Sequence, residues 1–483
     1  MFQEDIMNVE EYTRYDALGL AELVSSGEVT AEELSETARR ATEAVNNQLN
    51  AVVGFVDDRT ADTVNENARF KGVPTFLKDL GAGIAGMTQE MGSRLTTGFV
   101  PPFTSYLAQR MLDAGFSVIG RTTCPEFGLT LTTESLATGQ TKNPWNTAHI
   151  TGGSSGGSAA LVAAGAVPIA HTNDGGGSTR IPASICGNVG LKTSRGLVTL
   201  GPTLNDVTGP LIAEGCNSRT VRDTAAFLDA VAGPAAGEGV VTNRPAVSYL
   251  EKLNDAPKKY RIALSLDPWG GQPFSAETRA ETERIAETLS SLGHQVEEAT
   301  PDVVKDGAII ASFRTLWFTM AHSNIKKLVP LTKRQPGPDT LEPTTLQMAA
   351  AGAELSAFDY ASAIGYSNQV SRFLGSFFGH WDLILTPSMT QSTPKLGSAI
   401  TLLSGGTLDE WFEAAMALVP HTPVANFTGL PAISVPCGIG PGELPLGMHF
   451  FAPMGGESEL LDIARQLEIA EPWKDRKPVV FAN

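Results

Sequence analysis

The stretch from Thr151 to Gly196 reads TGGSSGGSAALVAAGAVPIAHTNDGGGSTRIPASICGNVGLKTSRG. Two clusters of glycine and serine, Gly152 to Ser158 and Gly175 to Ser178, enclose a run of small apolar residues. A flexible linker would not enclose an apolar run. Glycine instead lets the backbone approach another group closely and adopt torsions that other residues avoid. The stretch therefore predicts structured loops within a folded core.

Ser178 is a candidate nucleophile on local chemistry, because it follows three glycines. Consecutive backbone N–H groups around such turns can form a nest that binds anions. A serine in that nest has its hydroxyl next to donors that could hold an oxyanion. The alternative interpretation is that Ser178 caps a helix over Thr179 to Ser184, and the residues alone leave both open.

A serine hydroxyl is a poor nucleophile and needs a base. His149 and His171 are near in the chain but have no pattern around them, whereas Lys78 directly follows the apolar stretch Gly72 to Leu77. A lysine at the end of a buried strand loses hydration, so its pKa falls and a neutral amine can accept a proton. A solvated lysine paired with Asp79 or another acid remains the alternative.

Predicted strands and helices alternate along the chain. Thr30 and Glu33 form a capping-box pattern before a helical apolar stripe, and Ser105 can cap a helix that ends near Gly115. A further amphipathic helix is expected over 278–292, and short apolar strands are expected over 51–55, 116–119, 260–266, 381–385 and 432–435. Such alternation favours an α/β sandwich with a largely buried sheet.

Composition excludes several classes of protein. The chain has 483 residues, is 42% hydrophobic and carries a net charge of -17, which argues against a nucleic-acid binder. We find no apolar run long enough to span a membrane, and the first residues carry acids where a secretory signal carries positive charge. The four cysteines are far apart and the seven histidines lack a zinc-binding spacing. We therefore expect a cytoplasmic protein without a membrane segment, a metal site or a nucleic-acid partner.

The residues discussed above, taken together, resemble the signature of the amidase signature hydrolases, serine enzymes that cleave C–N bonds in amides. The matching pieces are Gly72-Val73-Pro74 with Lys78-Asp79, Asn143 to Asn146, Gly152 to Ser158, Asp174 to Ala183, and Gly429 to Pro436. The resemblance implies an α/β fold whose central mixed, twisted β-sheet is covered by helices on both faces. It also implies a small-molecule amide substrate and no cofactor.

The family pattern implies a role for each matching residue of the candidate site. Ser178 resembles the nucleophile, Ser154 resembles a bridging serine that follows a cis peptide bond, and Lys78 resembles the terminal base. The implied mechanism is a relay in which Lys78 takes a proton through Ser154 while Ser178 attacks the carbonyl, and water then hydrolyses the acyl-enzyme. A serine and lysine system of this kind is a known variant of the catalytic triad.

The same pattern implies how the nucleophile is supported. The backbone of Gly175, Gly176, Gly177 and Ser178 resembles the oxyanion hole. Asp174 and Arg180 are expected to form an ion pair under the loop as structural support. Gly175 stands where the family usually has threonine or a small aliphatic residue, which makes the loop looser.

Within the family, the chain is most similar to the 6-aminohexanoate cyclic dimer hydrolase branch. The hints are Asn173-Asp174, Thr132-Thr133-Glu134 and the C-terminal Leu467-Glu468. An esterase or carbamate hydrolase that uses the same serine is the alternative enzyme, since acyl-enzyme chemistry tolerates several leaving groups. An inactive homologue, or an amidotransferase-type subunit that acts only in a complex, is the alternative outside the enzymes.

Proline- and glycine-rich stretches divide the chain into four expected segments. Residues 1–70 form an N-terminal helical region packed on the core, and 71–235 form the signature core. Residues 236–345 form a peripheral helical region that shapes the substrate site, and 346–483 return to the core sheet and end in a helix. The pocket is expected to be shaped by 84–100, 125–140, 200–216, 310–345 and 400–425. The family also suggests a homodimer.

Overall fold

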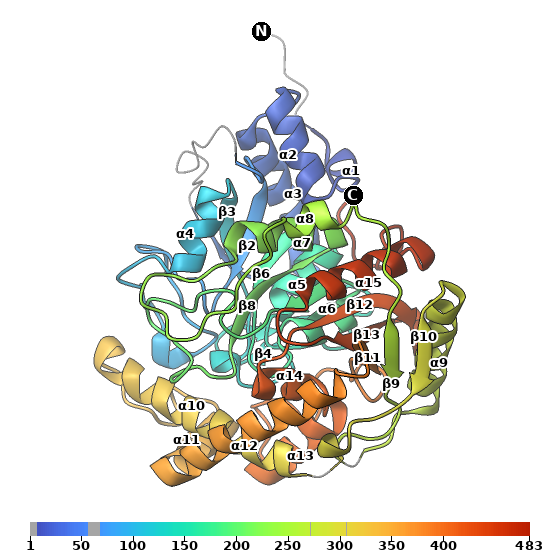
Figure 1. The fold of residues 1–483 in the computed structure, drawn as a ribbon. Coiled ribbons are helices and arrows are strands. Elements are labelled where there is room, and N and C mark those ends of the chain that lie inside the picture. Colours follow the sequence, from blue (N-terminus) through green and yellow to red (C-terminus); the bar gives the residue numbers. More distant parts are fainter. Residues whose placement is uncertain (1–6, 57–67, 271, 306) are drawn as a thin grey trace.

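A mixed eight-stranded sheet forms the centre of the computed structural model, which describes residues 7–56, 68–270, 272–305 and 307–483 (Figure 1). The strand order is β10-β9-β11-β13-β12-β7-β8-β6. The strands are β6 (Ile169–Asp174), β7 (Val189–Lys192), β8 (Ala213–Ser218), β9 (Arg261–Leu264), β10 (Gln295–Glu298), β11 (Leu383–Pro387), β12 (Ala432–Ile439) and β13 (Pro445–Phe451). β10, β9 and β11 run parallel to one another, and the remaining pairs are antiparallel.

Helices cover both faces of this sheet. α5 (Gly156–Ala163) and α6 (Arg180–Cys186) pack on one face, and α7 (Val221–Val231), α9 (Ala276–Ser291) and α15 (Glu457–Ala470) pack on the other. Side chains of a strand alternate between faces, so Ile433 and Val435 of β12 join the apolar cluster that contains α7 and α15. The intervening Ser434 lies beside Gly447, next to Ser184 of α6. The predicted fold class is therefore confirmed.

A smaller sheet of order β1-β3-β2 stands beside the first, formed by β1 (Val52–Phe55), β2 (Pro74–Lys78) and β3 (Ser117–Thr122). The N-terminal helices α1 (Val9–Tyr12), α2 (Ala17–Ser26) and α3 (Ala31–Leu49) lie at this end of the molecule (Figure 1). The predicted capping box of Thr30 and Glu33 begins α3, and Ser105 caps α4 (Tyr106–Asp113) as expected. Both caps satisfy N–H groups that the first helical turn leaves free.

The opposite end of the molecule is helical. It contains α10 (Ala308–Thr332), α11 (Pro343–Ala353), α12 (Ala357–Phe377), α13 (Leu408–Leu418) and α14 (Thr422–Thr428), which lie together at the bottom of Figure 1. The short elements α8 (Tyr249–Lys252), β4 (Glu134–Ser135) and β5 (Gly139–Gln140) complete the fold outside the 3-10 turns. The division into four segments stays a prediction; β9 and β10, at one edge of the large sheet, fall within its peripheral segment 236–345.

The two sheets meet where β2 runs beside β6. The hydroxyl of Thr75 on β2 donates to the carbonyl oxygen of Ile169 on β6 at 3.0 Å. Lys78 at the end of β2 is thereby brought near the end of β6, where the loop to α6 begins. Within the described part of the chain, none of the helices has the length and apolar character that crossing a membrane requires.

Candidate active site

Lys78 is the last residue of β2 and is fully buried. All five residues of that strand are buried, so the ammonium group loses the water that would stabilise its charge. Burial therefore lowers the pKa of Lys78 to about 8, although the charges of Glu214 and Asp174 act in the opposite direction. The predicted loss of hydration is confirmed, and a neutral amine becomes accessible at mildly alkaline pH.

The amine of Lys78 lies between two polar side chains. Its Nζ atom lies 2.7 Å from Ser154 Oγ and 2.6 Å from Asn173 Oδ1. The Asp79 carboxylate instead accepts the backbone N–H of Glu90. The alternative interpretation of a solvated lysine paired with Asp79 is therefore wrong, and the base predicted from the sequence contacts the predicted bridging serine.

Ser154 follows a cis Gly153–Ser154 peptide bond, as the resemblance implies, and lies two residues before α5. Backbone surrounds its side chain closely. A methyl group at Gly128 would lie 3.0 Å from Ser154 Oγ, and one at Gly153 would lie 2.6 Å from the backbone nitrogen of Thr132. Gly128 also has a φ of +70°, so this position requires glycine for both space and conformation.

Ser178 lies in the loop that joins β6 to α6 and is 6% exposed. The N-cap position of α6 is taken by Thr179, without a side-chain cap. The alternative interpretation of Ser178 as the helix cap is therefore wrong. Ser178 lines a cavity together with Gly128 and Gly153, the two glycines beside Ser154.

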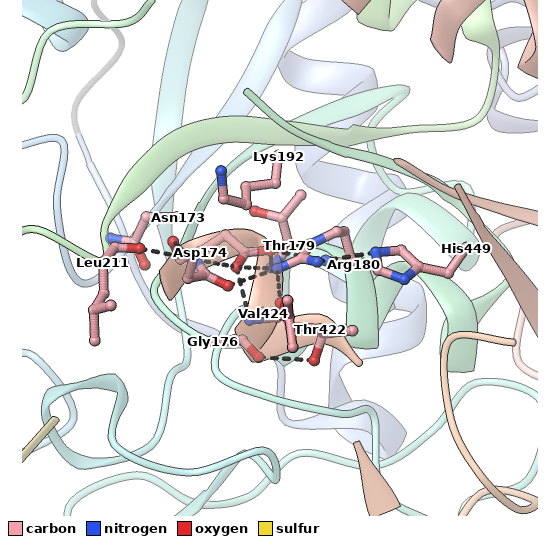
Figure 2. A network of polar contacts seen from close by, with 12 residues as sticks. Asn173, Asp174, Gly176, Thr179, Arg180, Lys192, Leu211, Thr422, Val424 and His449 are labelled. Carbon is pink, nitrogen blue, oxygen red and sulfur yellow. Dashed lines mark hydrogen bonds and ion pairs between the residues drawn. The ribbon is translucent and has the colours of Figure 1, made fainter. Parts of the chain in front are cut away.

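Asp174 and Arg180 form the predicted ion pair, fully buried beside the glycine loop (Figure 2). Arg180 donates to both carboxylate oxygens of Asp174 at 2.9 Å, and also to Asn426 Oδ1 and the carbonyl oxygen of Thr422. Burial by itself would raise the pKa of Asp174, but the Arg180 guanidinium and the bond from Asn426 hold it well below its ordinary value. The charges of Asp174 and Arg180 therefore compensate each other, and neither is left buried without a partner.

His449 closes this network from β13. Its Nε2 atom lies 2.9 Å from Arg180 Nη1, and arginine can only donate, so Nε2 is the unprotonated nitrogen of the ring. Burial, followed by the nearby charge of Arg180, lowers the pKa of His449 well below its ordinary value. The imidazole is therefore neutral, and it fixes the guanidinium without a competing charge.

The glycine loop beside the ion pair is held at specific backbone groups. The N–H of Gly177 donates to Asp174 Oδ1 at 2.7 Å, and the carbonyl of Gly176 accepts from Thr422 Oγ1 at 2.8 Å. The expectation that Gly177 contributes an oxyanion donor needs revision, because its N–H is engaged by Asp174. Within the described residues, the N–H groups of Gly175, Gly176 and Ser178 donate to no other group, and they remain the candidate donors.

The cavity at Ser178 has an empty volume of about 410 Å³, and aromatic and aliphatic side chains dominate its wall. No ionisable side chain lines it among the described residues. Its larger lining residues are Leu129, Leu131, Ile181, Phe313, Trp317, Trp411, Phe412, Met416 and Val419. All of these except Ile181 come from three of the five segments expected to shape the pocket, namely 125–140, 310–345 and 400–425. The signature itself contributes Ile181, Gly153 and Gly176.

A larger and more polar cavity, with an empty volume of about 1100 Å³, lies over Thr193 to Gly196 and Gly209 to Ala213. Arg195 in its wall donates to the carbonyl oxygens of Pro210, Asn426 and Phe427, so its guanidinium holds chain segments together. Lys78, Ser154 and Ser178 do not line this cavity. Ser178 lines the smaller, apolar cavity, which is therefore the candidate active site.

Several residues of the site were missed by reasoning from the sequence. Thr422, Asn426 and His449 lie more than 200 residues after the glycine loop, and no pattern near them indicates a role in supporting it. The sequence marks Asn173 only as a hint of the family branch, whereas in the structure its Oδ1 atom lies 2.6 Å from Lys78 Nζ. Among the described residues, no group of three or more His, Cys, Asp or Glu side chains could hold a metal ion.

The chain matches the family model described as Amidase over residues 33–461. It is 34% identical over 477 residues to the 6-aminohexanoate-cyclic-dimer hydrolase of Paenarthrobacter ureafaciens, an alignment that covers 96% of each chain. The corresponding enzyme of Pseudomonas sp. (strain NK87) is equally similar, with the same coverage.

Solved structures of related enzymes are also similar to this chain. A structure of 6-aminohexanoate cyclic dimer hydrolase complexed with substrate matches with a TM-score of 0.92 and 32% identity, and it covers 97% of this chain and 99% of that one. A bacterial aryl acylamidase of the amidase signature family matches with a TM-score of 0.82 and 25% identity, covering 95% of this chain and 96% of the other.

Proposed function

The chain belongs to the amidase signature family and is a hydrolase of amide C–N bonds, and from that premise we propose that Lys78, Ser154 and Ser178 carry the reaction. The observation that carries the proposal is the distance of 2.7 Å between Lys78 Nζ and Ser154 Oγ, with the lysine buried in a strand end. A neutral amine at that distance can take the hydroxyl proton of Ser154.

The proposed relay begins when the amine of Lys78 accepts the proton of Ser154, which in turn accepts the proton of Ser178. Ser178 Oγ then forms a bond to the amide carbonyl carbon, and the negative charge on the carbonyl oxygen is held by the N–H groups of Gly176 and Ser178. When the C–N bond breaks, the proton returns through Ser154 to the leaving amine. Water attacks the resulting ester at Ser178, which releases the acid and restores the serine.

The proposed substrate is an uncharged amide with an apolar body. An ionised group in the cavity would lose hydration without a partner of opposite charge, which is costly. The cavity instead offers the rings of Phe313 and Trp317, which stack with centroids 5.5 Å apart. Because the relatives act on the 6-aminohexanoate cyclic dimer, we propose a cyclic amide of this kind as the first substrate to test.

The proposal is tested with the purified chain alone and a panel of neutral cyclic, anilide, ester and zwitterionic linear amide substrates. We expect hydrolysis of neutral amides, and stoichiometric labelling by a fluorophosphonate that is lost in Ser178→Ala. Hydrolysis of esters without amides would favour the alternative esterase, and no hydrolysis by the chain alone would favour an inactive homologue or a subunit. Wild-type turnover in Ser178→Ala would reject the proposed nucleophile.

We also propose the cytoplasm as the location and a homodimer as the assembly. All four cysteines are buried free thiols, which is typical of a reducing compartment. Cell fractionation tests the location, and sedimentation of the purified chain tests the assembly.

A further inference from the structure

His171 and Asn173 lie two residues apart on β6, so both side chains project from one face of the strand, toward β2. His171 Nδ1 accepts the backbone N–H of Lys78 at 3.2 Å, and Asn173 Oδ1 lies 2.6 Å from Lys78 Nζ. The strand therefore holds Lys78 at its main chain and at the end of its side chain.

His171 is itself fixed from the next strand. Its Nε2 atom lies 2.8 Å from Glu214 Oε2 on β8. Because Nδ1 accepts from Lys78, Nε2 carries the ring proton and donates it to the Glu214 carboxylate. These two hydrogen bonds allow His171 only the tautomer that is protonated at Nε2. In that tautomer Nδ1 can accept the backbone N–H of Lys78 and hold it in place.

The amide of Asn173 has one orientation for a similar reason. Its Nδ2 atom donates to the carbonyl oxygen of Leu80 at 3.1 Å, and a carbonyl oxygen can only accept. The amide oxygen of Asn173 therefore faces Lys78. Since that oxygen can also only accept, one N–H of Lys78 must donate to it.

A neutral lysine amine has two N–H donors and one lone pair. Once one N–H is held by Asn173 Oδ1, rotation about the bond to Nζ is restricted, and the lone pair can be directed at Ser154 Oγ, 2.7 Å away. We infer that Asn173 is a positioning residue, which aims the lone pair of Lys78 at Ser154 while adding no charge beside it. The inference rests on the proposed role of Lys78 as the base.

The absence of charge at position 173 matters because other charges already face Lys78. The thiol of Cys124 after β3 is uncharged, because burial raises its pKa, and the charged groups are the carboxylates of Glu214 on β8 and Asp174 at the end of β6. Each favours the ammonium form, and burial outweighs them. A further carboxylate at the position of Asn173 Oδ1 would favour the ammonium form strongly, as opposite charges in contact do.

The test compares Asn173→Asp and Asn173→Ala through the pH dependence of kcat/KM for a neutral amide. In Asn173→Asp we expect the midpoint of the acidic limb to rise by about 1 to 3 pH units, with activity recovering at higher pH. In Asn173→Ala we expect the plateau to fall about 2- to 10-fold, the effect of one hydrogen bond between neutral groups, with a midpoint no higher than that of the wild type.

Asn188→Asp is the matched control, because Asn188 is a fully buried asparagine whose Nδ2 also donates to a backbone carbonyl, that of Ala159. It should leave the midpoint unchanged even if it lowers the melting temperature. A wild-type midpoint in Asn173→Asp would overturn the inference. If that variant does not fold, an unchanged kcat/KM in Asn173→Ala would overturn it.

Failure of the inference is distinguishable from failure of the proposed function. Wild-type activity in Ser178→Ala or Lys78→Ala would reject the proposed relay itself. If the Ser178 and Lys78 variants are inactive but both Asn173 variants behave like the wild type, only the positioning role of Asn173 is rejected.

Discussion

Thr422 Oγ1 donates to the carbonyl oxygen of Gly176 at 2.8 Å, across 246 residues of sequence. Thr422 is the first residue of α14, and its own carbonyl oxygen accepts from Arg180. The helix thus holds the glycine loop beside the ion pair, at the residue whose N–H is a candidate oxyanion donor. The contact orients the Gly176–Gly177 peptide group, which lies between the candidate donors of Gly176 and Ser178, and only the tertiary fold provides it.

Replacing Thr422 by valine keeps the shape of the side chain and removes this hydrogen bond. We expect kcat to fall about 5-fold, because one neutral hydrogen bond is worth about 1 kcal/mol and the loop would be less well oriented. Steady-state kinetics on a neutral amide checks the effect. Thr428→Val is the control, since its hydroxyl donates to Val424 within the same helix. Equal losses in both variants would contradict a specific role for Thr422.

The rate should depend on the protonation of Lys78. Because the proposed base must be neutral and its pKa is about 8, kcat/KM should rise with pH and reach half of its plateau near pH 8. Lys78→Arg should be inactive across the whole range, since a guanidinium stays charged. A pH profile of kcat/KM measures both. A midpoint well below neutral pH would point to a different base.

We expect the buried ion pair of Asp174 and Arg180 to make a large contribution to the free energy of unfolding. Arg180→Met leaves the Asp174 carboxylate buried without its partner, and we expect a loss of roughly 3–5 kcal/mol in the free energy of unfolding. Arg180→Lys keeps the charge but loses the two-pronged contact, so a smaller loss is expected. Denaturant unfolding at neutral pH compares the two. Arg279→Met, which removes an exposed pair with Glu283, is the control.

The same pair predicts the direction of acid unfolding. The pKa of Asp174 is held below its ordinary value of 3.8, so its contribution is present above that pH and is lost as the pH falls below it. Unfolding midpoints measured between neutral and acidic pH should therefore converge for the wild type and Arg180→Met in acid. Parallel curves would contradict this assignment.

Glu342 should have the opposite pH dependence. Burial, followed by the charge of Glu126, raises the pKa of Glu342 from 4.5 to about 8. The folded state then binds more protons than the unfolded state between these values, so stability falls as the pH rises through this range. Glu342→Gln removes the charge, and it should stabilise the protein by a few kcal/mol at about pH 8 and by less near pH 5.

Thermal unfolding at the two pH values measures the effect of Glu342→Gln. Exposed Glu354, at the other end of the same helix, provides the control substitution Glu354→Gln. A stabilisation that is equal at both pH values would show that the gain does not come from the charge of Glu342.

Local patterns in the sequence were enough to predict much of the site. The capping box at Thr30, the strand that ends at Lys78 and the glycine loop before Ser178 are confirmed as elements of the structure. These features depend on backbone torsions and on hydrogen bonds over three or four residues, which neighbouring side chains determine. Ser178 is a candidate nucleophile from local chemistry, whereas the bridging role of Ser154 is implied only by the family resemblance.

The amino-acid sequence by itself determined the fold class, the amidase family and the residues proposed for the reaction. Only the tertiary structure decided that Asn173 contacts Lys78 and that Thr422 and His449 support the glycine loop. Those contacts join segments that are distant in the chain, and they form when β2, β6, β13 and α14 pack together. No short-range pattern encodes such a meeting, because it depends on the packing of the whole core.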